Sequence, residues 1–478
     1  MEHKFARYDA VIVGSGPNGL SAGIVLAAAG LRTLILERAP TIGGGTRTLE
    51  LTEPGFRHDV CSAIHPLAAG SPFFRSLPLE RYGLEWIHPE IPLAQPLEGD
   101  RAVALRRTVI GTAAGLGADR SAYLRVYRPL VRDANRLLPG VMGPIRPRAL
   151  SLPLVRFGLP ALRSAEGIAR EHFSGAPARA LFAGVAAHSF LRLDQPGSAA
   201  FGLLLIVAGH AYGWPFPRGG SQAIADALAG YFRDLGGEIA TGIDVRSFVD
   251  LPHTRAYLFD TTPRQVLEIA GERIDGLYRR QLERYRHGPG IFKVDYALSA
   301  PIPWAADECR RAGTVHVGGT FEEVAHAEMA VLEGCHAERP FVLVAQQSLF
   351  DDTRAPAGKH VAWAYCHVPH GSDVDMTARI ERQIERFAPG FKDVILARHT
   401  FTARQMEQYN PNYIGGDISS GSNDLYQVVA RPALKWDPYR TSDPAIFICS
   451  AATPPGGGVH GMAGYHAARS ALRLLGSA

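Results

Sequence analysis

The stretch DAVIVGSGPNGLSAGIVLAAAGLRTLILER, residues 9–38, decides the fold. Its apolar start, Ala10 to Val13, is typical of a buried parallel strand. Three glycines follow in the spacing G-x-G-x-x-G, then Leu20 to Ala29 predicts a helix and Leu34 to Leu36 a second strand. Strand, glycine turn, helix and strand in this order predict the dinucleotide-binding unit of a Rossmann-like fold.

Each conspicuous residue of this unit has a physical role. Gly14 allows the tight turn, Gly16 lets a pyrophosphate approach the backbone, and Gly19 lets helix and strand pack closely. The phosphates are expected at the helix N-terminus, where free N–H groups and the helix dipole favour anions. Glu37 ends the second strand and is placed to accept hydrogen bonds from a ribose, which leaves NAD or FAD as the cofactor. The cofactor-binding residues expected here are Gly14, Ser15, Gly16, Pro17, Asn18, Gly19, Glu37 and Arg38.

A second glycine-rich segment, TIGGGTRT at residues 41–48, follows Glu37 closely. It resembles the Gly-Gly motif of the superfamily of FAD-dependent amine oxidases and phytoene desaturases. In that family an arginine often follows the glycine pair directly, whereas here Gly45 takes that place and the arginine is Arg47. The resemblance implies that Gly44, Gly45, Thr46 and Arg47 contact the cofactor. A plain surface position is the alternative for Arg47.

The C-terminal sequence IFICSAATPPGGGVHGMAGYHAA, residues 446–468, is similar to the segment of this family that returns to the N-terminal domain. A buried strand there runs through a glycine-rich loop into a helix, whose N-terminus faces the flavin. The helix dipole would stabilise an anionic reduced flavin. The resemblance implies cofactor contacts from Gly457, Gly458, Gly461 and Met462. Ser450 replaces the glycine that usually follows the strand.

A third family-like segment starts with PRGGSQ at residues 217–222 and continues as a helix and a strand expected to end near Val245. The resemblance implies a backbone contact from Val245 to adenine, and a further strand of the same domain around residues 258–263. The similarity covers nearly the whole chain and is closest to phytoene-dehydrogenase-related oxidoreductases. The expected cofactor is therefore FAD.

The expected fold class is α/β, of the glutathione-reductase-2 or amine-oxidase type. A discontinuous Rossmann-like FAD-binding domain is assigned to residues 1–75, 215–270 and 430–478. An α+β substrate domain with a mostly antiparallel sheet is assigned to residues 76–214 and 271–429. Alternating residues predict strands at 291–298, 341–346 and 360–367, and residues 374–387 predict a helix.

Composition narrows the function classes. The net charge of +4 over 478 residues gives no case for nucleic acid. The five scattered cysteines form no C-x-x-C pair and are interpreted as reduced thiols of a cytoplasmic protein. No signal peptide is expected, because the first strand starts by about Asp9. No metal-binding cluster is apparent.

One segment suggests peripheral membrane contact. Residues 134–165 contain five arginines, no acidic residue and many leucines. A basic, apolar helical segment of this kind can lie in a membrane interface and admit a lipid substrate. The alternative is a core-packed helix whose arginines extend toward water.

Flavin dehydrogenation transfers a hydride to flavin N5 and requires positioning more than acid–base groups. The expected substrate is an apolar, isoprenoid- or carotenoid-like molecule, as the resemblance implies. His58 and His210 are the candidate catalytic residues. Asp59, Tyr212 and Trp214 are candidate walls of the substrate pocket. With no second G-x-G-x-x-G after a strand, oxygen or a quinone is the expected electron acceptor.

Two other functions share the expected fold. The first is an FAD-dependent amine oxidase, in which Lys293 would lie near flavin N5. The second is a non-enzymatic, GDI-like protein that binds prenyl groups and holds no flavin. The intact glycine loops at both ends of the chain favour the enzyme.

Overall fold

The computed structural model describes residues 8–144 and 151–476. Its first sheet is parallel, with strand order β16-β10-β1-β2-β9, and the chain enters it from three separate segments. The strands expected at 10–13, 34–36 and 446–449 appear in it, whereas the one expected around residues 258–263 lies earlier, at Ala256–Phe259, and Pro263 already begins a helix. The strands are β1 (Ala10–Val13), β2 (Thr33–Glu37), β9 (Glu238–Thr241), β10 (Ala256–Phe259) and β16 (Ile446–Ile448).

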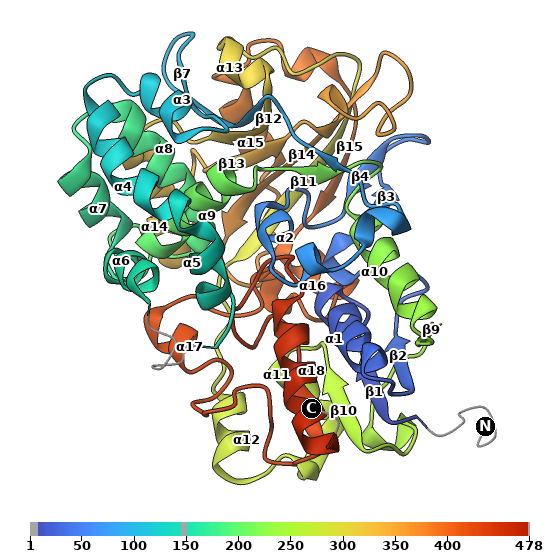
Figure 1. Ribbon diagram of the computed structural model, residues 1–478. Helices are drawn as coiled ribbons and strands as arrows, with labels where there is room; N and C mark the ends of the chain where they lie inside the picture. The colour runs from blue at the N-terminus through green and yellow to red at the C-terminus, as the bar shows by residue number, and fades with distance from the viewer. Residues whose placement is uncertain (1–7, 145–150, 477–478) are drawn as a thin grey trace.

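Helix α1 (Pro17–Ala28) covers one face of this sheet together with α10 (Gln222–Asp234) and α18 (Met462–Leu475). The contact with α18 is unusually close, because a Cβ on Gly464 would lie only 1.8 Å from the Asn18 carbonyl oxygen. Figure 1 shows the C-terminal helix running beside α1. The two ends of the chain therefore pack together on one face of this parallel sheet. The other face is covered by α11 (Pro263–Ala270) and α12 (Gly276–Glu283).

The second sheet has seven strands in the order β15-β11-β14-β13-β12-β6-β7. Its neighbours are antiparallel except for the parallel pair β12–β6, which confirms the mostly antiparallel sheet. Its strands are β6 (Ile91–Pro96), β7 (Ala102–Leu105), β11 (Gly290–Leu298), β12 (Ala312–Val317), β13 (Val342–Ala345), β14 (His360–Val368) and β15 (Ile395–Phe401).

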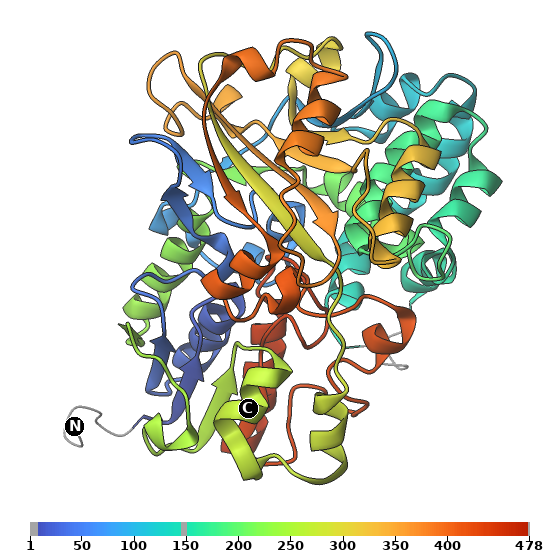
Figure 2. The ribbon, with the colours of Figure 1, turned by 180° about the vertical axis from the view of Figure 1, so that it is seen from behind.

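The two faces of the large sheet have different neighbours. Helix α15 (Thr377–Glu385) buries Ile380 and Ile384 on the outer face, against strand residues such as Val344 and Ala364. Figure 2 shows this side of the molecule. Side chains of alternate parity on β13 and β14 point the other way, toward the nucleotide-binding domain. That inner face is where a substrate site can form.

A block of helices closes the inner side of the large sheet (Figure 1). Most of it comes from residues 109–211, and α9 is buried along much of its length. No helix among residues 8–144 and 151–476 is long and apolar enough to span a bilayer. The helices of the block are α3 (Val109–Ala114), α4 (Arg120–Arg132), α5 (Ala134–Val141), α6 (Leu152–Ala161), α7 (Ala165–His172), α8 (Ala176–Ala186), α9 (Ala199–Ala211) and α14 (Phe321–Leu332).

Short elements complete the fold, and several boundaries differ from expectation. The strand expected to end near Val245 ends at Thr241, so Val245 lies in the loop after β9. Helix α1 begins at Pro17, earlier than the predicted Leu20, because proline is well suited to the first turn. The remaining elements are α2 (Pro66–Gly70), α13 (Asp307–Arg310), α16 (Ala403–Tyr409), α17 (Leu425–Val429), β3 (Thr48–Glu50), β4 (Arg57–Asp59), β5 (Trp86–Ile87) and β8 (Phe216–Pro217).

A buried ion pair joins the segment after the glycine pair to the substrate side. Asp59, at the end of β4, and Arg354 are both fully buried, and their side chains lie 2.8 Å apart. Asp59 also accepts hydrogen bonds from the Thr48 hydroxyl and the Ser221 N–H. Burial alone would raise the pKa of Asp59, but Arg354 and these hydrogen bonds hold it below its usual value. The carboxylate is thus charged and fully engaged.

Replacing Arg354 by Met should leave Asp59 buried without its partner. We expect the free energy of unfolding to fall by roughly 3–5 kcal/mol, as when one member of a buried pair is removed. Chemical denaturation followed by far-UV circular dichroism measures this. Arg246→Met, at an exposed pair with Asp244, is the control and should unfold almost as the wild type does. Equal midpoints for the two variants would contradict the structural role of the pair.

Candidate functional site

One large cavity, of about 1450 Å³, lies between the nucleotide-binding sheet, the large sheet and the helical block. The glycine loops of the first domain line one half of it, which is called here the cradle. Side chains from the large sheet, α6 and α9 line the other half, called the chamber. A bound dinucleotide and a substrate would therefore share one continuous space.

The first glycine loop requires its glycines for steric reasons. Gly14 has a φ of +102°, and a Cβ there would lie 2.9 Å from the Asp260 carbonyl oxygen. A Cβ on Gly16 would lie 2.7 Å from the Asp260 carboxylate, and one on Gly19 only 2.1 Å from the Gly14 carbonyl oxygen. Gly14 and Gly16 line the cradle, whereas Gly19 lies in the helix–strand contact. This geometry suits a pyrophosphate that approaches the start of α1.

Glu37 and Arg47 are paired at the cradle wall. Arg47 Nη2 lies 3.1 Å from Glu37 Oε1, and the arginine is 6% exposed. Glu37 Oε2 accepts hydrogen bonds from the Ser15 hydroxyl and backbone N–H. The alternative of a surface position for Arg47 is therefore wrong. The pair holds the Glu37 carboxylate at the end of β2, beside the first glycine loop.

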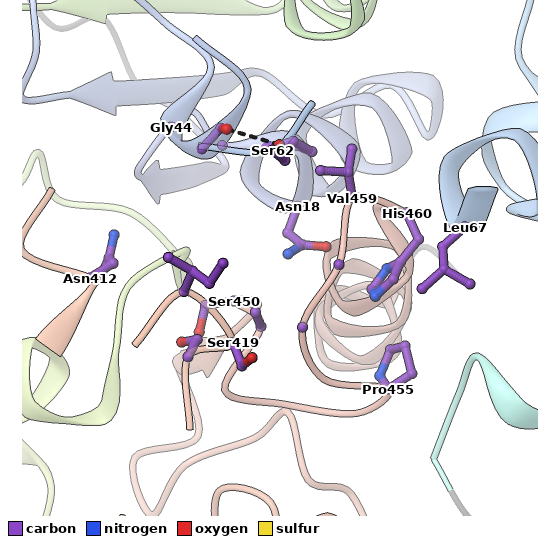
Figure 3. A pocket seen from close by; sticks show the side chains of 18 of the residues that line it. Asn18, Gly44, Ser62, Leu67, Asn412, Ser419, Ser450, Pro455, Val459 and His460 are labelled. Atoms are coloured by element: carbon purple, nitrogen blue, oxygen red, sulfur yellow. Dashed lines mark hydrogen bonds between the residues drawn. The ribbon is translucent and has the colours of Figure 1, made fainter. Parts of the chain in front are cut away.

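The second glycine loop and the C-terminal loop complete the cradle. A Cβ on Gly44 would lie 3.2 Å from Gly16 Cα, so the two N-terminal loops touch. Figure 3 shows Asn18, from the start of α1, and His460, from the C-terminal loop, on neighbouring sides of the same space. Of the predicted cofactor residues, Gly14, Ser15, Gly16, Pro17, Asn18, Glu37, Arg38, Gly44, Gly45, Thr46, Arg47, Val245, Gly457 and Gly458 line the cavity.

Three predicted cofactor residues do not line it. Gly19 packs against Gly14, and Gly461 faces Ser21 and Phe74, where a Cβ would lie 2.2 Å from the Ser21 hydroxyl oxygen. Met462 begins α18 and is 3% exposed. These residues lie in the layer that packs beneath the cradle, and Gly19 and Gly461 allow close helix packing there.

Asp260 is a carboxylate that sequence reasoning did not single out. It follows β10 directly and lines the cradle, with Oδ2 accepting a hydrogen bond from the Gly19 N–H at 2.9 Å. Burial raises the pKa of Asp260 to about 8, and the nearby Glu37 adds to this shift. Burial therefore favours the neutral form of the side chain beside the first glycine loop.

The chamber is built mainly from apolar and aromatic groups. Cross-strand register pairs Thr314 with Ala345, Ala345 with Trp363, and Leu343 with Tyr365. These residues share the inner face of the large sheet, and helices α6 and α9 face them across the chamber. The chamber is lined by Phe157, Leu159, Leu162, Phe190, Phe201, Leu204, Leu205, Trp214, Leu343, Trp363 and Tyr365.

His58 and His210, the predicted catalytic residues, lie outside the lining of the cavity. His58 is 1% exposed, with Nε2 at 2.8 Å from the Thr52 hydroxyl oxygen, and burial lowers its pKa to about 3. His210 lies 2.7 Å from the Tyr123 hydroxyl oxygen, and burial lowers its pKa to about 4. Both positions suit packing and domain contact. His188, His65 and His460 are the histidines that line the cavity.

The other predicted substrate-side residues divide in the same way. Trp214 lines the chamber, 3% exposed. Neither Asp59 nor Tyr212 lines the cavity. Asp59 is paired with Arg354, and the Tyr212 hydroxyl donates a hydrogen bond to Asn135 at 2.8 Å. Lys293, considered for the amine oxidase alternative, is fully buried and paired with Asp295 away from the lining.

Several lining residues were missed because no motif marks them. Trp363 and Tyr365 sit on alternate positions of β14, so period-2 patterning of the predicted strand could have identified their shared face. His188 and Phe190 lie in the connection between α8 and α9, where the sequence carries no comparable signal. In the described chain, no group of three or more His, Cys, Asp or Glu side chains is arranged to hold a metal ion.

Comparison with known proteins agrees with this architecture. Residues 12–77 match the model of the NAD(P)-binding Rossmann-like domain family. The chain is 25% identical to the pyridine nucleotide-disulfide oxidoreductase domain-containing protein 2 of Rattus norvegicus. The alignment covers 98% of this chain and 94% of the rat protein.

Two solved structures share the fold. A putrescine oxidase variant superimposes with a TM-score of 0.65 and 14% identity, covering 99% of both chains. Rab GDI from Plasmodium falciparum gives a TM-score of 0.51 and 13% identity, covering 98% of both chains. Because an oxidase and a Rab GDI both appear, the fold alone does not decide the activity. The α/β fold of the amine-oxidase type with a Rossmann-like nucleotide-binding domain is confirmed.

The position of Asp260 generates a pH-dependent prediction. Its carboxyl is neutral below about pH 8 and ionises above it, where it would repel a pyrophosphate at the start of α1. Binding of FAD to the cofactor-free protein should therefore weaken about tenfold between roughly pH 7 and pH 9. Asp260→Asn should bind with little pH dependence over this range, as isothermal titration calorimetry would measure.

Asp244→Asn is the matched control, since Asp244 also lines the cavity but pairs with Arg246 near its edge. This variant should keep the pH dependence of the wild type. Identical pH profiles for wild type and Asp260→Asn would refute a role for the Asp260 charge.

Proposed function

We propose that this protein is an FAD-dependent oxidoreductase of the desaturase or dehydrogenase class, which moves a hydride between an apolar, isoprenoid-like substrate and flavin N5. The observation that carries the proposal is the single cavity in which a dinucleotide cradle opens into an apolar chamber. A hydride can move only between groups held in contact, and a shared space allows that contact.

The cradle fits FAD. Glu37 would hold the ribose, the start of α1 the pyrophosphate, and the loop from Gly457 to His460 the flavin end. Bound FAD supplies the redox chemistry by accepting or donating a hydride at N5. The chain's own residues orient the cofactor and exclude water from the chamber. Oxygen or a quinone is the proposed electron acceptor.

The charge distribution favours an apolar substrate over an amine. The carboxylates that line the cavity in the described chain, Glu37, Asp244, Asp260 and Glu268, come from the nucleotide-binding domain. The chamber itself offers an alkylammonium ion no carboxylate to pair with, and burying an unpaired charge is costly. Aromatic and aliphatic walls instead suit a hydrocarbon skeleton.

The mouth of the chamber carries an unusual group of exposed apolar side chains, called here the entry rim. Leu159 is 66% exposed on α6, and Leu434 and Trp436 are 69% and 83% exposed after α17. All three also line the cavity. Exposed apolar patches of this kind mark contact surfaces, and a tryptophan is well suited to the membrane interface. We propose that the rim touches a lipid surface from which the substrate enters. The rim is defined here by exposed apolar residues that also line the cavity: Val155, Leu159, Leu162, Val429, Leu434 and Trp436.

This proposal revises the interpretation of residues 134–165. Helices α5 and α6 fall in this segment, and Arg156 pairs with Asp133 at 3.5 Å while Arg163 pairs with Glu171. Arg146 and Arg148 lie outside the described residues. The apolar side chains of α6, rather than its arginines, therefore carry the proposed membrane contact.

The direct test of the reaction is anaerobic. The FAD-loaded protein should lose its oxidised flavin absorbance when titrated with isoprenoid hydrocarbons, and regain it when oxygen or a quinone is added. Release of hydrogen peroxide with a panel of amines and not with lipids would favour the amine oxidase. A colourless protein that cannot be reconstituted with FAD would favour the GDI-like alternative. Rapid bleaching by NADH or NADPH would contradict the proposed electron route.

The entry rim has its own test. Leu159→Asp combined with Trp436→Asp should abolish sedimentation with phosphatidylcholine–phosphatidylglycerol liposomes, because charge on the rim opposes insertion into the interface. Val249→Asp is the control, since Val249 is 89% exposed but lies outside the cavity lining. It should leave sedimentation unchanged. Absence of liposome binding by the wild-type protein would disprove membrane entry.

A further inference from the structure

The chamber walls carry a few polar groups, among them the Thr314 hydroxyl, the indole N–H groups of Trp214 and Trp363, and the imidazole of His188. His188 lies in the short 3-10 turn between α8 and α9, Ala187–Ser189, and lines the cavity with part of its surface accessible. The indole ring of Trp214 packs beside it, with ring centroids 6.3 Å apart. A histidine in such surroundings must either be fully hydrogen-bonded by the protein or be available to a ligand.

One ring nitrogen of His188 is held by a second histidine. His188 Nε2 lies 3.1 Å from Nε2 of His316, which projects from β12 and is fully buried. Burial and the nearby His367 lower the pKa of His188 to about 3, and burial also lowers the pKa of His316. Both rings are therefore neutral, and one donates a hydrogen bond to the other.

The surroundings of His316 indicate which ring donates. Gln95 donates its amide N–H to the Gly319 carbonyl oxygen at 2.8 Å, which fixes the amide orientation. Gln95 Oε1 and His316 Nδ1 are both buried without a hydrogen-bond partner, and both lie against Gly184. No hydrogen bond joins these two atoms, but a proton on His316 Nδ1 is favoured beside the unpaired oxygen, because a lone pair there would repel it. We therefore infer that His316 Nε2 is the acceptor for the N–H of His188. The second nitrogen of His188, Nδ1, is then left with a lone pair.

The other histidines of the cavity differ from His188. His65 Nε2 lies 2.8 Å from the Ser221 hydroxyl oxygen, and His460 Nδ1 accepts the Met462 N–H. Their second nitrogens are buried atoms. Nδ1 of His188 has no hydrogen-bond partner among the described residues and is not one of the buried unpaired atoms. It is therefore the histidine nitrogen that the chamber offers to a ligand.

We propose that His188 is the polar contact of the substrate site and that its Nδ1 accepts a hydrogen bond from a hydroxyl group on an otherwise isoprenoid-like molecule. The substrate class is thereby narrowed from a hydrocarbon to an isoprenoid alcohol. A neutral acceptor suits an uncharged hydroxyl, since the chamber provides no countercharge for an ion. This inference rests on the proposed function, because it assumes that the chamber holds the substrate.

The test compares three ligands of one skeleton on the FAD-loaded protein: geranylgeraniol, its methyl ether and the corresponding hydrocarbon. Dissociation constants come from quenching of tryptophan fluorescence under anaerobic conditions, which requires no turnover. Only the alcohol can donate a hydrogen bond. We expect it to bind about 3- to 10-fold more tightly than the ether and the hydrocarbon, as a net hydrogen bond allows.

Two variants locate the effect at His188. His188→Leu should lower the affinity for the alcohol to that for the ether, and His188→Gln, which keeps an acceptor, should restore part of the preference. Both should retain FAD and the wild-type affinity for the hydrocarbon, which shows that the chamber is intact. If His188→Leu loses FAD or fails to fold, the ligand series on the wild type still decides.

Equal affinity for alcohol and ether, or a preference that survives in His188→Leu, overturns the inference, as does failure of all three ligands to bind. These outcomes are separate from the proposed function. Flavin reduction by an isoprenoid hydrocarbon would support the oxidoreductase even when the alcohol has no advantage. Flavin that no isoprenoid reduces would contradict the oxidoreductase, even when the alcohol binds preferentially.

Discussion

The close approach of backbone to backbone at the start of helix α1 is the constraint on which the rest of this structure depends. Gly19 touches the Gly14 carbonyl, and Gly464 brings α18 onto Asn18. Any side chain at these positions would push the helix away from β1 or from α18. Because the contacts are this tight, the first turn of α1 is fixed and can present its N-terminus to an anion. The N-terminal and C-terminal segments must therefore fold together.

Buried polar groups, rather than apolar contacts alone, join the nucleotide-binding domain to the large sheet. The hairpin of β3 and β4 follows the second glycine loop and delivers Asp59 to Arg354. Next to it, Lys293 and Asp295 pair on β11, and His58 Nδ1 lies 3.6 Å from Asp295. Buried ion pairs keep a fixed geometry, because separating the partners would leave an uncompensated buried charge. This network sets the large sheet against the nucleotide-binding domain.

Local patterns were sufficient to predict the nucleotide-binding domain. The glycine spacing, the apolar strands and the position of Glu37 each follow from short-range rules, and β1, β2 and β16 appear where those rules put them, while α1 begins three residues earlier than predicted. The end of the strand before Val245 was placed four residues too late: Gly242, with a φ of +72°, follows the last pair with β2 directly and ends the strand at Thr241. The strands at 291–298 and 360–367 were also predicted from alternation, and the structure adds their order in the sheet.

The substrate side could not be derived in the same way. His58 and His210 were chosen because they adjoin recognisable segments, yet tertiary packing buries both outside the cavity lining. His188, Trp363 and Asp260 reach the cavity through contacts between segments far apart in sequence. No spacing rule connects them, since the cavity forms only when the large sheet, α9 and the cradle meet. The substrate site is a property of the assembled domains.

The central claim, that the cradle holds FAD, is tested most directly by equilibrium binding. The cofactor-free protein should be titrated separately with FAD and NAD, with binding followed by calorimetry and by the visible spectrum of the flavin. If the proposal holds, we expect saturable binding of one FAD per chain, with a perturbed flavin spectrum, and much weaker binding of NAD. Tighter binding of NAD, or no binding of FAD, would contradict it.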